Sequence, residues 1–484
     1  MGVQDYAHRE VNMNRRAFHR AALGVASGAL CRGLFAQGSA PYEPTWASLK
    51  THPVPDWYRN AKFGIFVHWG LYSVPAWAVP TGELGKVEPG KWFIDNPYAE
   101  WYLNTLRIAG SPTAKHHAET YGKDFDYYNF RPMFNKAVAA WDPNVMASLF
   151  HGAGARYVVL TTKHHDGFTL FPSRVKNPRH PGLSTTRDLV GDLAAAVRGK
   201  GMKMGTYYSG GLDWTFTSEP IRNFADIRAR VPQSEEYAQY ADAHWRELIE
   251  RYRPAVMWND IDYPKAGKLP QLFAQFYNTV PDGVIDNRFG VEFADFTTPE
   301  YAKYDKITEK KWESCRGLGF SFGYNQVEGP EHVIAADKLI ALLVDIVSKN
   351  GNLLLNVGPK PDGSISEIQL DRLHKLGDWL AVNGEGIFDT HPWVRASPPA
   401  ASGPQVRFTH KGDSLYAFFL ERPEAPRVTL PGVVASEGTA VRVLGAGADT
   451  KWEQQGRDVL VNIGQAPGPY AMGLRITPAP RALD

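Results

Sequence analysis

The stretch LTTKHHDGFTLF, residues 160–171, places His164, His165 and Asp166 at the end of an apolar run. These residue types can ligate a metal ion, activate a nucleophile or hydrogen-bond a polar substrate. The sequence has no H-E-x-x-H motif and no cysteine cluster for a metal, and no G-x-S-x-G turn for a serine nucleophile. Because neutral imidazole offers one donor and one acceptor, we favour hydrogen bonding to substrate hydroxyls. The alternative is that both histidines only complete the hydrogen bonding of a loop.

From about residue 142 the chain alternates between segments with helical spacing of apolar residues and short apolar runs. The runs are RYVVLTT, MKMGTYYS, PAVMWND, GVIDNRF and NLLLNVGP, and they are preceded by AKFGIFVHWG, which ends with His68. This alternation predicts βα units around a parallel sheet. The runs end in polar and aromatic residues, as strands do at the active face of a TIM-type barrel. A doubly wound open sheet is the competing fold, but no glycine-rich phosphate loop follows any run.

The predicted fold class is therefore α/β, with a TIM-like (β/α) barrel over residues 41–390. After SPPAASGPQ the pattern changes to short alternating runs, namely SLYAFFL, RVTL, AVRVLG and DVLVNI. Turn residues separate these runs and no long helical stretch remains. The pattern predicts a C-terminal antiparallel β-sandwich over residues 391–484.

Residues 1–40 resemble a twin-arginine export signal. Arg15 and Arg16 are followed by Phe18 and by a weakly apolar stretch that is too short to span a membrane stably. Small residues near positions 36–40 are suited to cleavage, so we expect a periplasmic or secreted protein. Cys315 is the only cysteine beyond this leader, which excludes an internal disulfide in the mature chain.

The composition narrows the class of partner. The net charge of +2 gives no reason to expect nucleic acid or an anionic membrane. Aromatic residues make up 12% of the chain and include 14 tryptophans, whose indole faces suit the C–H faces of sugars as well as a buried core. Hydrophobic residues make up 43% of the chain and charged residues 21%, which is ordinary for a soluble globular enzyme.

An ordered series of motifs resembles family 29 of the glycoside hydrolases, the retaining α-L-fucosidases. The motifs cover roughly residues 41 to 390 and are AKFGIFVHWGLYSVPAW, EWY, TTKHHDGF, YYSGGLDW, MWND, TTPEY, KWESC, FGYN and NGNLLLNVGPKPDGSI. No single motif is specific, but the set in this order is. The resemblance implies a barrel followed by a β-sandwich, no metal or organic cofactor, and a fucosylated oligosaccharide or glycoconjugate as substrate.

Glycoside hydrolysis needs a nucleophilic carboxylate and a carboxylic acid that donates a proton. The resemblance implies that Asp260, in MWND, is the nucleophile, and the end of a barrel strand suits that role; capping of the next helix is the alternative. The acid/base is expected in the loop after IDNRFG, where Glu300 matches best. Spacing alone does not separate Glu300 from Glu292, Asp295 or Glu313, and Glu313 is the main rival.

The resemblance also implies the residues that bind the sugar. Arg288 is expected beside Asp260, where its charge favours the carboxylate form. Tyr208 is the alternative to Tyr207, since neighbouring residues of a strand point to opposite faces. Phe322 stands where the family usually has tryptophan, which we associate with the subsite beyond fucose. The full set expected to bind fucose is His68, Glu100, Trp101, His164, His165, Tyr207, Trp258 and Arg288.

The sequence therefore predicts an exported, retaining exo-α-L-fucosidase that works by double displacement. A barrel glycosidase for another α-linked sugar, such as a galactoside, is one alternative. A catalytically inactive sugar-binding relative is the other, although an intact Asp260 speaks against it.

Overall fold

The computed structural model describes residues 41–398 and 405–482, and Tyr42–Asp484 form one compact unit. The expected export signal lies outside the described residues. In the described part, no helix combines the length and the apolar character that crossing a membrane requires.

Seven parallel strands form the central sheet in the order β5-β4-β3-β2-β1-β7-β6. Their side chains are almost all buried, as expected for a parallel sheet that helices cover. The strands span Phe63–Val67 (β1), Tyr157–Lys163 (β2), Lys203–Tyr208 (β3), Val256–Asn259 (β4), Val284–Ile285 (β5), Trp312–Gly317 (β6) and Gly351–Val357 (β7). The sheet and its connections confirm the TIM-like barrel, because consecutive strands pair in parallel and helices form most of the crossovers.

An irregular segment, residues 295–300, bridges the two edge strands of this sheet. Asp295 N donates to Ile285 O in β5 at 2.9 Å, and Glu313 N in β6 donates to Thr297 O at 2.8 Å. Parallel bridges also pair Thr297 with Trp312 and Glu300 with Cys315. We call residues 295–300 the closing segment, because its backbone completes the ring of strands between β5 and β6.

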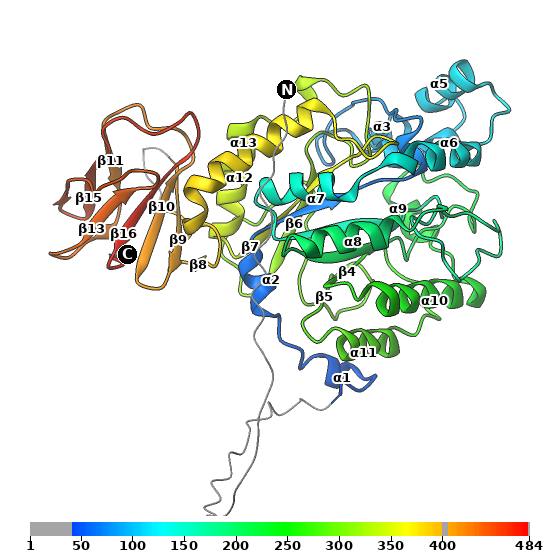
Figure 1. Ribbon diagram of the computed structural model, residues 1–484, viewed down its shortest axis with the longest axis horizontal. Coiled ribbons are helices and arrows are strands. Elements are labelled where there is room, and N and C mark those ends of the chain that lie inside the picture. The colour runs from blue at the N-terminus through cyan, green and yellow to red at the C-terminus, as the bar shows by residue number, and fades with distance from the viewer. Residues whose placement is uncertain (1–40, 399–404, 483–484) are drawn as a thin grey trace, which may run out of the picture. The chain divides into compact units, whose positions relative to one another are not determined.

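The helices begin where the sequence offers capping side chains. Ser234 accepts a hydrogen bond from Tyr237 N at the start of α10, and Asp142 does so from Asn144 N before Pro143 opens α7. Helices α11, α10, α8, α7, α13 and α12 contact one another in that order around the strands (Figure 1). The α-helices span Trp46–Leu49 (α1), Asp56–Ala61 (α2), Pro89–Ile94 (α3), Tyr102–Leu106 (α4), Pro112–Tyr121 (α5), Phe130–Ala137 (α6), Pro143–Gly152 (α7), Leu189–Gly199 (α8), Phe224–Ala229 (α9), Glu235–Tyr252 (α10), Leu269–Thr279 (α11), Ala336–Ser348 (α12) and Glu367–Asn383 (α13).

Beyond His391 the described chain contains only antiparallel strand pairs. They build a five-stranded sheet, β13-β16-β10-β9-β8, and a three-stranded sheet, β11-β15-β14, around a separate apolar core. The strands span His391–Pro392 (β8), Val406–Lys411 (β9), Ser414–Phe419 (β10), Arg427–Leu430 (β11), Val433–Val434 (β12), Ala440–Val443 (β13), Trp452–Gln455 (β14), Asp458–Asn462 (β15), Met472–Thr477 (β16) and Arg481–Ala482 (β17). These antiparallel sheets confirm the expected all-β C-terminal part. The exact boundary at residues 390–391 stays a prediction.

A buried carboxylate connects the helical part to the antiparallel strands. Asp345 in α12 is 1% exposed and pairs with Lys349 at 2.9 Å, with Lys303 at 2.6 Å and with Arg407 in β9. Burial alone would raise the pKa of Asp345, but hydrogen bonds and ion pairs from the three cations outweigh burial and lower the pKa to about 2. The ionised carboxylate is therefore part of the folded state at neutral pH.

Candidate active site

A cavity of about 200 Å³ opens at the carboxyl ends of the strands. Drug-sized ligands occupy pockets of roughly 300–1,000 Å³, so this volume suits a single sugar ring. The structure brings all ten residues predicted from the sequence to this one cavity, namely His68, Glu100, Trp101, His164, His165, Tyr207, Trp258, Asp260, Arg288 and Glu300. Their roles in binding and catalysis stay predictions.

His164 and His165 both reach the cavity because strand alternation ends before them. The pairing of β2 with β3 shifts register between Thr161 and Lys163, and β2 stops at Lys163. His165 Nδ1 lies 2.6 Å from the hydroxyl of Ser209, and buried His164 Nδ1 has no partner among the described residues. Burial lowers the pKa of both imidazoles well below the usual range, so both rings are neutral at pH 7.

His68 follows β1 and is held in one orientation by Asn356 at the end of β7. Its Nδ1 lies 2.7 Å from Asn356 Oδ1. Since an amide oxygen only accepts, Nδ1 carries the proton and Nε2 is left as an acceptor. Burial lowers the pKa of His68 to about 3, against a smaller upward effect of the Asn356 hydrogen bond. The ring can therefore accept from a sugar hydroxyl.

Asp166 does not belong to the cavity. Its carboxylate accepts from Tyr127 Oη at 2.9 Å and from Phe168 N at 3.1 Å. Burial raises its pKa to about 6. Asp166 therefore stabilises the turn that presents the two histidines.

The structure also decides between the two tyrosines of β3. Tyr207 lines the cavity and donates to Asp260 Oδ2 at 2.9 Å. Tyr208 points the other way, and its hydroxyl lies 3.0 Å from His244 Nδ1 on α10. Strand alternation thus gives one tyrosine to the site and the other to the packing of a helix.

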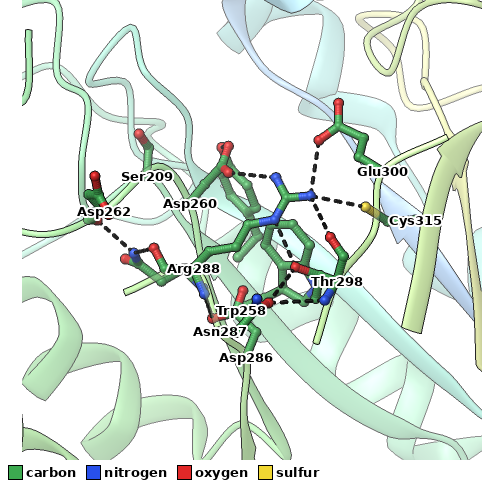
Figure 2. A network of polar contacts seen from close by, with 12 residues as sticks. Ser209, Trp258, Asp260, Asp262, Asp286, Asn287, Arg288, Thr298, Glu300 and Cys315 are labelled. Atoms are coloured by element: carbon green, nitrogen blue, oxygen red, sulfur yellow. Dashed lines mark hydrogen bonds and ion pairs between the residues drawn. The ribbon is translucent and has the colours of Figure 1, made fainter. Parts of the chain in front are cut away.

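A single guanidinium joins Asp260 and Glu300 (Figure 2). Arg288 Nη1 donates to Asp260 Oδ1 at 2.9 Å, and Nη2 donates to Glu300 Oε2 at 3.0 Å. Arg288 Nε bonds Thr298 Oγ1 at 2.9 Å, and its carbon Cζ lies 4.6 Å from the ring centre of Trp258. These contacts fix the planar cation, and the cation positions both carboxyl groups.

The pKa of Asp260 reflects a balance between burial and this cation. Burial raises the pKa above its ordinary value, Arg288 opposes the rise, and the charge of Glu300 adds to it. The expected effect of Arg288 is present, but burial prevails and the net shift is upward. Ionised Asp260 thus depends on Arg288.

Among the four candidate acids, only Glu300 reaches the cavity. Glu313 lies inside the barrel and accepts hydrogen bonds from Tyr58, Tyr157 and the Trp258 indole. Asp295 accepts from Tyr277 Oη at 2.8 Å and Ile285 N at 2.7 Å, and Glu292 is exposed away from the cavity lining. Glu313 holds the indole of Trp258 beneath Arg288 and does not line the cavity, while the identity of the acid stays a prediction.

Glu100 and Tyr98 lie on a short turn from the long insertion between β1 and α7. Glu100 Oε2 accepts from Gly323 N at 2.7 Å, and burial raises the pKa of Glu100 to about 7. Tyr98 donates to Glu300 Oε1 at 2.9 Å, which makes it a second residue that holds the candidate acid. Sequence reasoning missed Tyr98, although it lies two residues before Glu100 and just ahead of the motif EWY.

Phe322 lies in the wall of the cavity itself. Its ring centre is 4.9 Å from that of His68 and 5.4 Å from that of Tyr98, and its side chain is 5% exposed. Phe322 thus packs among the inner residues, and an effect of this position on the subsite beyond fucose stays a prediction. Cys315, also missed, lines the same wall, with Sγ 3.4 Å from Arg288 Nη2.

No group of three or more His, Cys, Asp or Glu side chains in the described part of the chain is arranged to hold a metal ion. The polar groups that converge in the cavity are instead three carboxyls, of which Arg288 joins two, together with neutral imidazoles and phenols, interleaved with indoles. A parallel barrel with a pair of neighbouring carboxyl groups, here Asp260 and Glu300, in one small cavity is the arrangement of a glycoside hydrolase.

Comparison with known proteins identifies the family. A sequence model described as alpha-L-fucosidase matches residues 30–385, and the chain belongs to this family of glycoside hydrolases. The tissue alpha-L-fucosidase of Bos taurus is 33% identical over 446 residues, covering 88% of each chain. The alpha-L-fucosidase of Dictyostelium discoideum is 32% identical over 84% of this chain and 87% of its own.

Solved structures agree with this assignment. The alpha-fucosidase of Thermotoga maritima in complex with fucose is 43% identical, with a TM-score of 0.82 over 90% of this chain and 100% of its own. An alpha-L-fucosynthase form of that enzyme, in complex with alpha-L-Fuc-(1-2)-beta-L-Fuc-N3, is 44% identical with a TM-score of 0.85. The protein is therefore an α-L-fucosidase by family, fold and gathered residues.

Proposed function

We propose that the protein is an exported, retaining exo-α-L-fucosidase that releases terminal α-L-fucosyl residues from glycans by double displacement. The observation that carries this mechanism is the Arg288 guanidinium, which hydrogen-bonds Asp260 through Nη1 and Glu300 through Nη2. One cation thereby holds two carboxyl groups at the same small cavity.

In the first step the Asp260 carboxylate attacks the anomeric carbon of the fucosyl residue. The bond from this carbon to the leaving oxygen breaks, and protonated Glu300 gives its proton to that oxygen. Before the attack, Tyr207 and Arg288 stabilise the negative charge of Asp260 by hydrogen bonds. Asp260 loses this charge when the ester forms. A covalent β-fucosyl-enzyme results.

In the second step water attacks the same carbon from the side that the leaving group vacated. Glu300, now a carboxylate, takes the proton of the water, and the ester bond to Asp260 breaks. Two inversions restore the α-configuration, and both carboxyl groups return to their starting protonation states. The carboxyl groups are expected about 5–5.5 Å apart in a complex with fucose, as retention requires.

Recognition of fucose is assigned to the neutral imidazoles of His68, His164 and His165. Asn356 occupies Nδ1 of His68 and Ser209 occupies Nδ1 of His165, so each of these rings turns its Nε2 to the sugar. His164 Nδ1 has no partner among the described residues and is available to a hydroxyl. Trp101, Tyr207 and Trp258 supply flat apolar faces for the C–H edges of the sugar. The cavity volume of about 200 Å³ supports removal of one terminal residue, not cleavage within a chain.

Two measurements test the mechanism. A panel of nitrophenyl glycosides separates a fucosidase from a galactosidase, and turnover of the α-L-fucoside excludes a sugar-binding relative without activity. Proton NMR during hydrolysis then shows which anomer forms first. Early α-fucose supports retention, whereas early β-fucose overturns double displacement.

Export is proposed from Arg15 and Arg16, which precede an apolar stretch. The test is expression of the full chain and of an Arg15→Lys, Arg16→Lys variant in a bacterium with a twin-arginine pathway. Fucosidase activity is expected in the periplasm or medium for the first and in the cytoplasm for the second. Equal distribution of both would contradict twin-arginine export.

A further inference from the structure

The outer part of the cavity lining is apolar, whereas the Asp, Glu, Arg and His side chains of the lining all belong to the residues assigned above. Five side chains form this part of the lining, and none belongs to the ten residues assigned to fucose or catalysis. We call them the apolar mouth: Leu84, Trp92, Phe224, Ile227 and Ile261. Phe224 is 50% exposed, and Leu84, Ile227 and Ile261 are partly exposed, whereas Trp92 is 4% exposed and lies deeper. Of the ten assigned residues only Arg288 and Glu300 are partly exposed, with 19% and 21% of their side chains accessible.

A row of aromatic rings leads from the candidate acid to this mouth. Tyr98 donates to Glu300, and its ring is 5.0 Å from that of Trp92 in an edge-on arrangement. Trp92 in turn lies nearly parallel to Phe224, with ring centres 6.4 Å apart. Since the acid gives its proton to the leaving oxygen, the row starts where the leaving group must begin and ends at the surface.

Ile261 reaches the mouth from an unusual backbone conformation. Its φ is 54°, a left-handed value that is a genuine outlier for a β-branched residue, and Asp262 follows with φ 63°. The turn is packed tightly, because a side chain on Gly211 would meet the carbonyl oxygen of Ile261. Strain of this kind concentrates at functional sites. Here it places an apolar side chain directly after Asp260.

We infer that the apolar mouth is the subsite for the leaving group, and that it binds a pyranose ring by stacking against its C–H face. This inference rests on the proposed fucosidase mechanism. None of the five side chains is charged, so the subsite selects for a ring with an apolar face and gives no anchor to an acidic or basic group. Phe224, on the six-residue helix α9, is the most exposed ring of the row. Its truncation should therefore remove the most accessible stacking surface.

The test compares Phe224→Ala with wild type on three substrates that differ only in the leaving group. A fucosyl disaccharide offers a pyranose ring, nitrophenyl α-L-fucoside an aryl ring, and α-L-fucosyl fluoride no ring. We expect kcat/KM for the disaccharide to fall about tenfold more than kcat/KM for the fluoride. Phe224→Tyr, which keeps the ring, should restore most of the loss. Met133→Ala, on α6 and similarly exposed at 46%, is the control and should leave all three values near wild type.

The outcomes are distinct. Equal losses on all three substrates would overturn the subsite, because they would show a general disturbance of the fold. A loss confined to the aryl fucoside would overturn the assignment to a sugar. If wild type hydrolyses none of the three, the proposed function fails, whereas failure of the subsite alone leaves hydrolysis of the fluoride intact.

Discussion

Arg288 donates from Nη1 to Asp260 Oδ1 at 2.9 Å, and this contact opposes the effect of burial on the carboxyl. Because Asp260 must be ionised to attack, kcat/KM should fall as the pH drops through the raised pKa of Asp260, above the ordinary value of about 3.9. Arg288→Gln removes the cation that opposes this rise, so the acid limb should move to higher pH. The measurement is the pH profile of kcat/KM on an aryl fucoside.

Arg288→Lys is the matched control for charge. It keeps a cation but loses the planar fork that reaches both carboxyl groups. Its acid limb should stay nearer to wild type while the rate falls at every pH. An acid limb at the wild-type position in the folded Gln variant would show that Asp260 does not depend on Arg288.

Asp260→Gly should abolish turnover and leave the fold intact, because Asp260 follows strand β4 and is not part of it. The circular dichroism spectrum should therefore match that of wild type. The substitution vacates space beside the anomeric carbon. Added azide should enter that space, restore part of the activity on an activated fucoside and yield β-fucosyl azide, detectable by NMR. Wild-type rates in the folded variant would remove Asp260 from the nucleophile's role.

Glu300→Ala should lower hydrolysis of fucosyl disaccharides by roughly 10²–10⁴-fold, because their leaving groups need a proton. The first step on a nitrophenyl fucoside should lose much less, although its overall turnover falls with the lost base. Glu313→Gln should instead affect good and poor leaving groups alike and lower the thermal stability, since three buried donors lose their carboxylate. The opposite pattern would reassign the acid to Glu313.

Asp345→Asn should destabilise the fold at neutral pH by about 2 kcal/mol, the free energy that corresponds to lowering the pKa to about 2. A depressed pKa stabilises the folded state above the unfolded value near 3.9. That contribution is lost as the pH falls from about 4 to about 2. The melting temperatures of variant and wild type should therefore differ at pH 7 and converge toward pH 2.

Asp371→Asn is the control for this effect, because its ion pairs with Arg372 and Lys375 lie at the surface with 41% of the Asp371 side chain exposed. Surface pairs of this kind add little to stability. A change in melting temperature as large as that of Asp345→Asn would show that burial of the Asp345 network is not what stabilises the fold.

Activity should be unaffected by prolonged dialysis against a chelator. The expectation rests on the neutral, hydrogen-bonded imidazoles His68 and His165 and on the absence of a third ligand at metal distance among the described residues. The readout is the rate on an aryl fucoside before and after dialysis. If activity were lost on dialysis and returned with zinc or calcium, the histidines would be reassigned as metal ligands.

The barrel and the inner site could be predicted because both follow from repeated local patterns. Apolar runs such as RYVVLTT and PAVMWND can only be buried strands, and parallel strands bring their carboxyl ends to one face. His164, Tyr207 and Asp260 therefore come together without knowledge of any contact. The resemblance added roles that spacing alone could not assign.

The parts that escaped prediction have no such pattern. The closing segment contains Pro299 and pairs through isolated bridges, so it carries no strand periodicity. Trp92 and Phe224 lie on six-residue helices in loops, where neither length nor amphipathicity gives a signal. Their meeting depends on tertiary packing, which places α3 against α9 through a Phe93–Phe224 ring contact at 5.0 Å.

The closing segment determines where residues can be inserted into this part of the chain. Glu292, exposed ahead of the segment, is a position where inserted residues would leave both strand pairings in register. One residue inserted between Asp295 and Glu300 would instead slip the pairing with β6 and turn the Glu300 side chain to the opposite face. Loop grafting aimed at new glycans must therefore end before Asp295, because any change of length beyond that point also moves the Glu300 side chain.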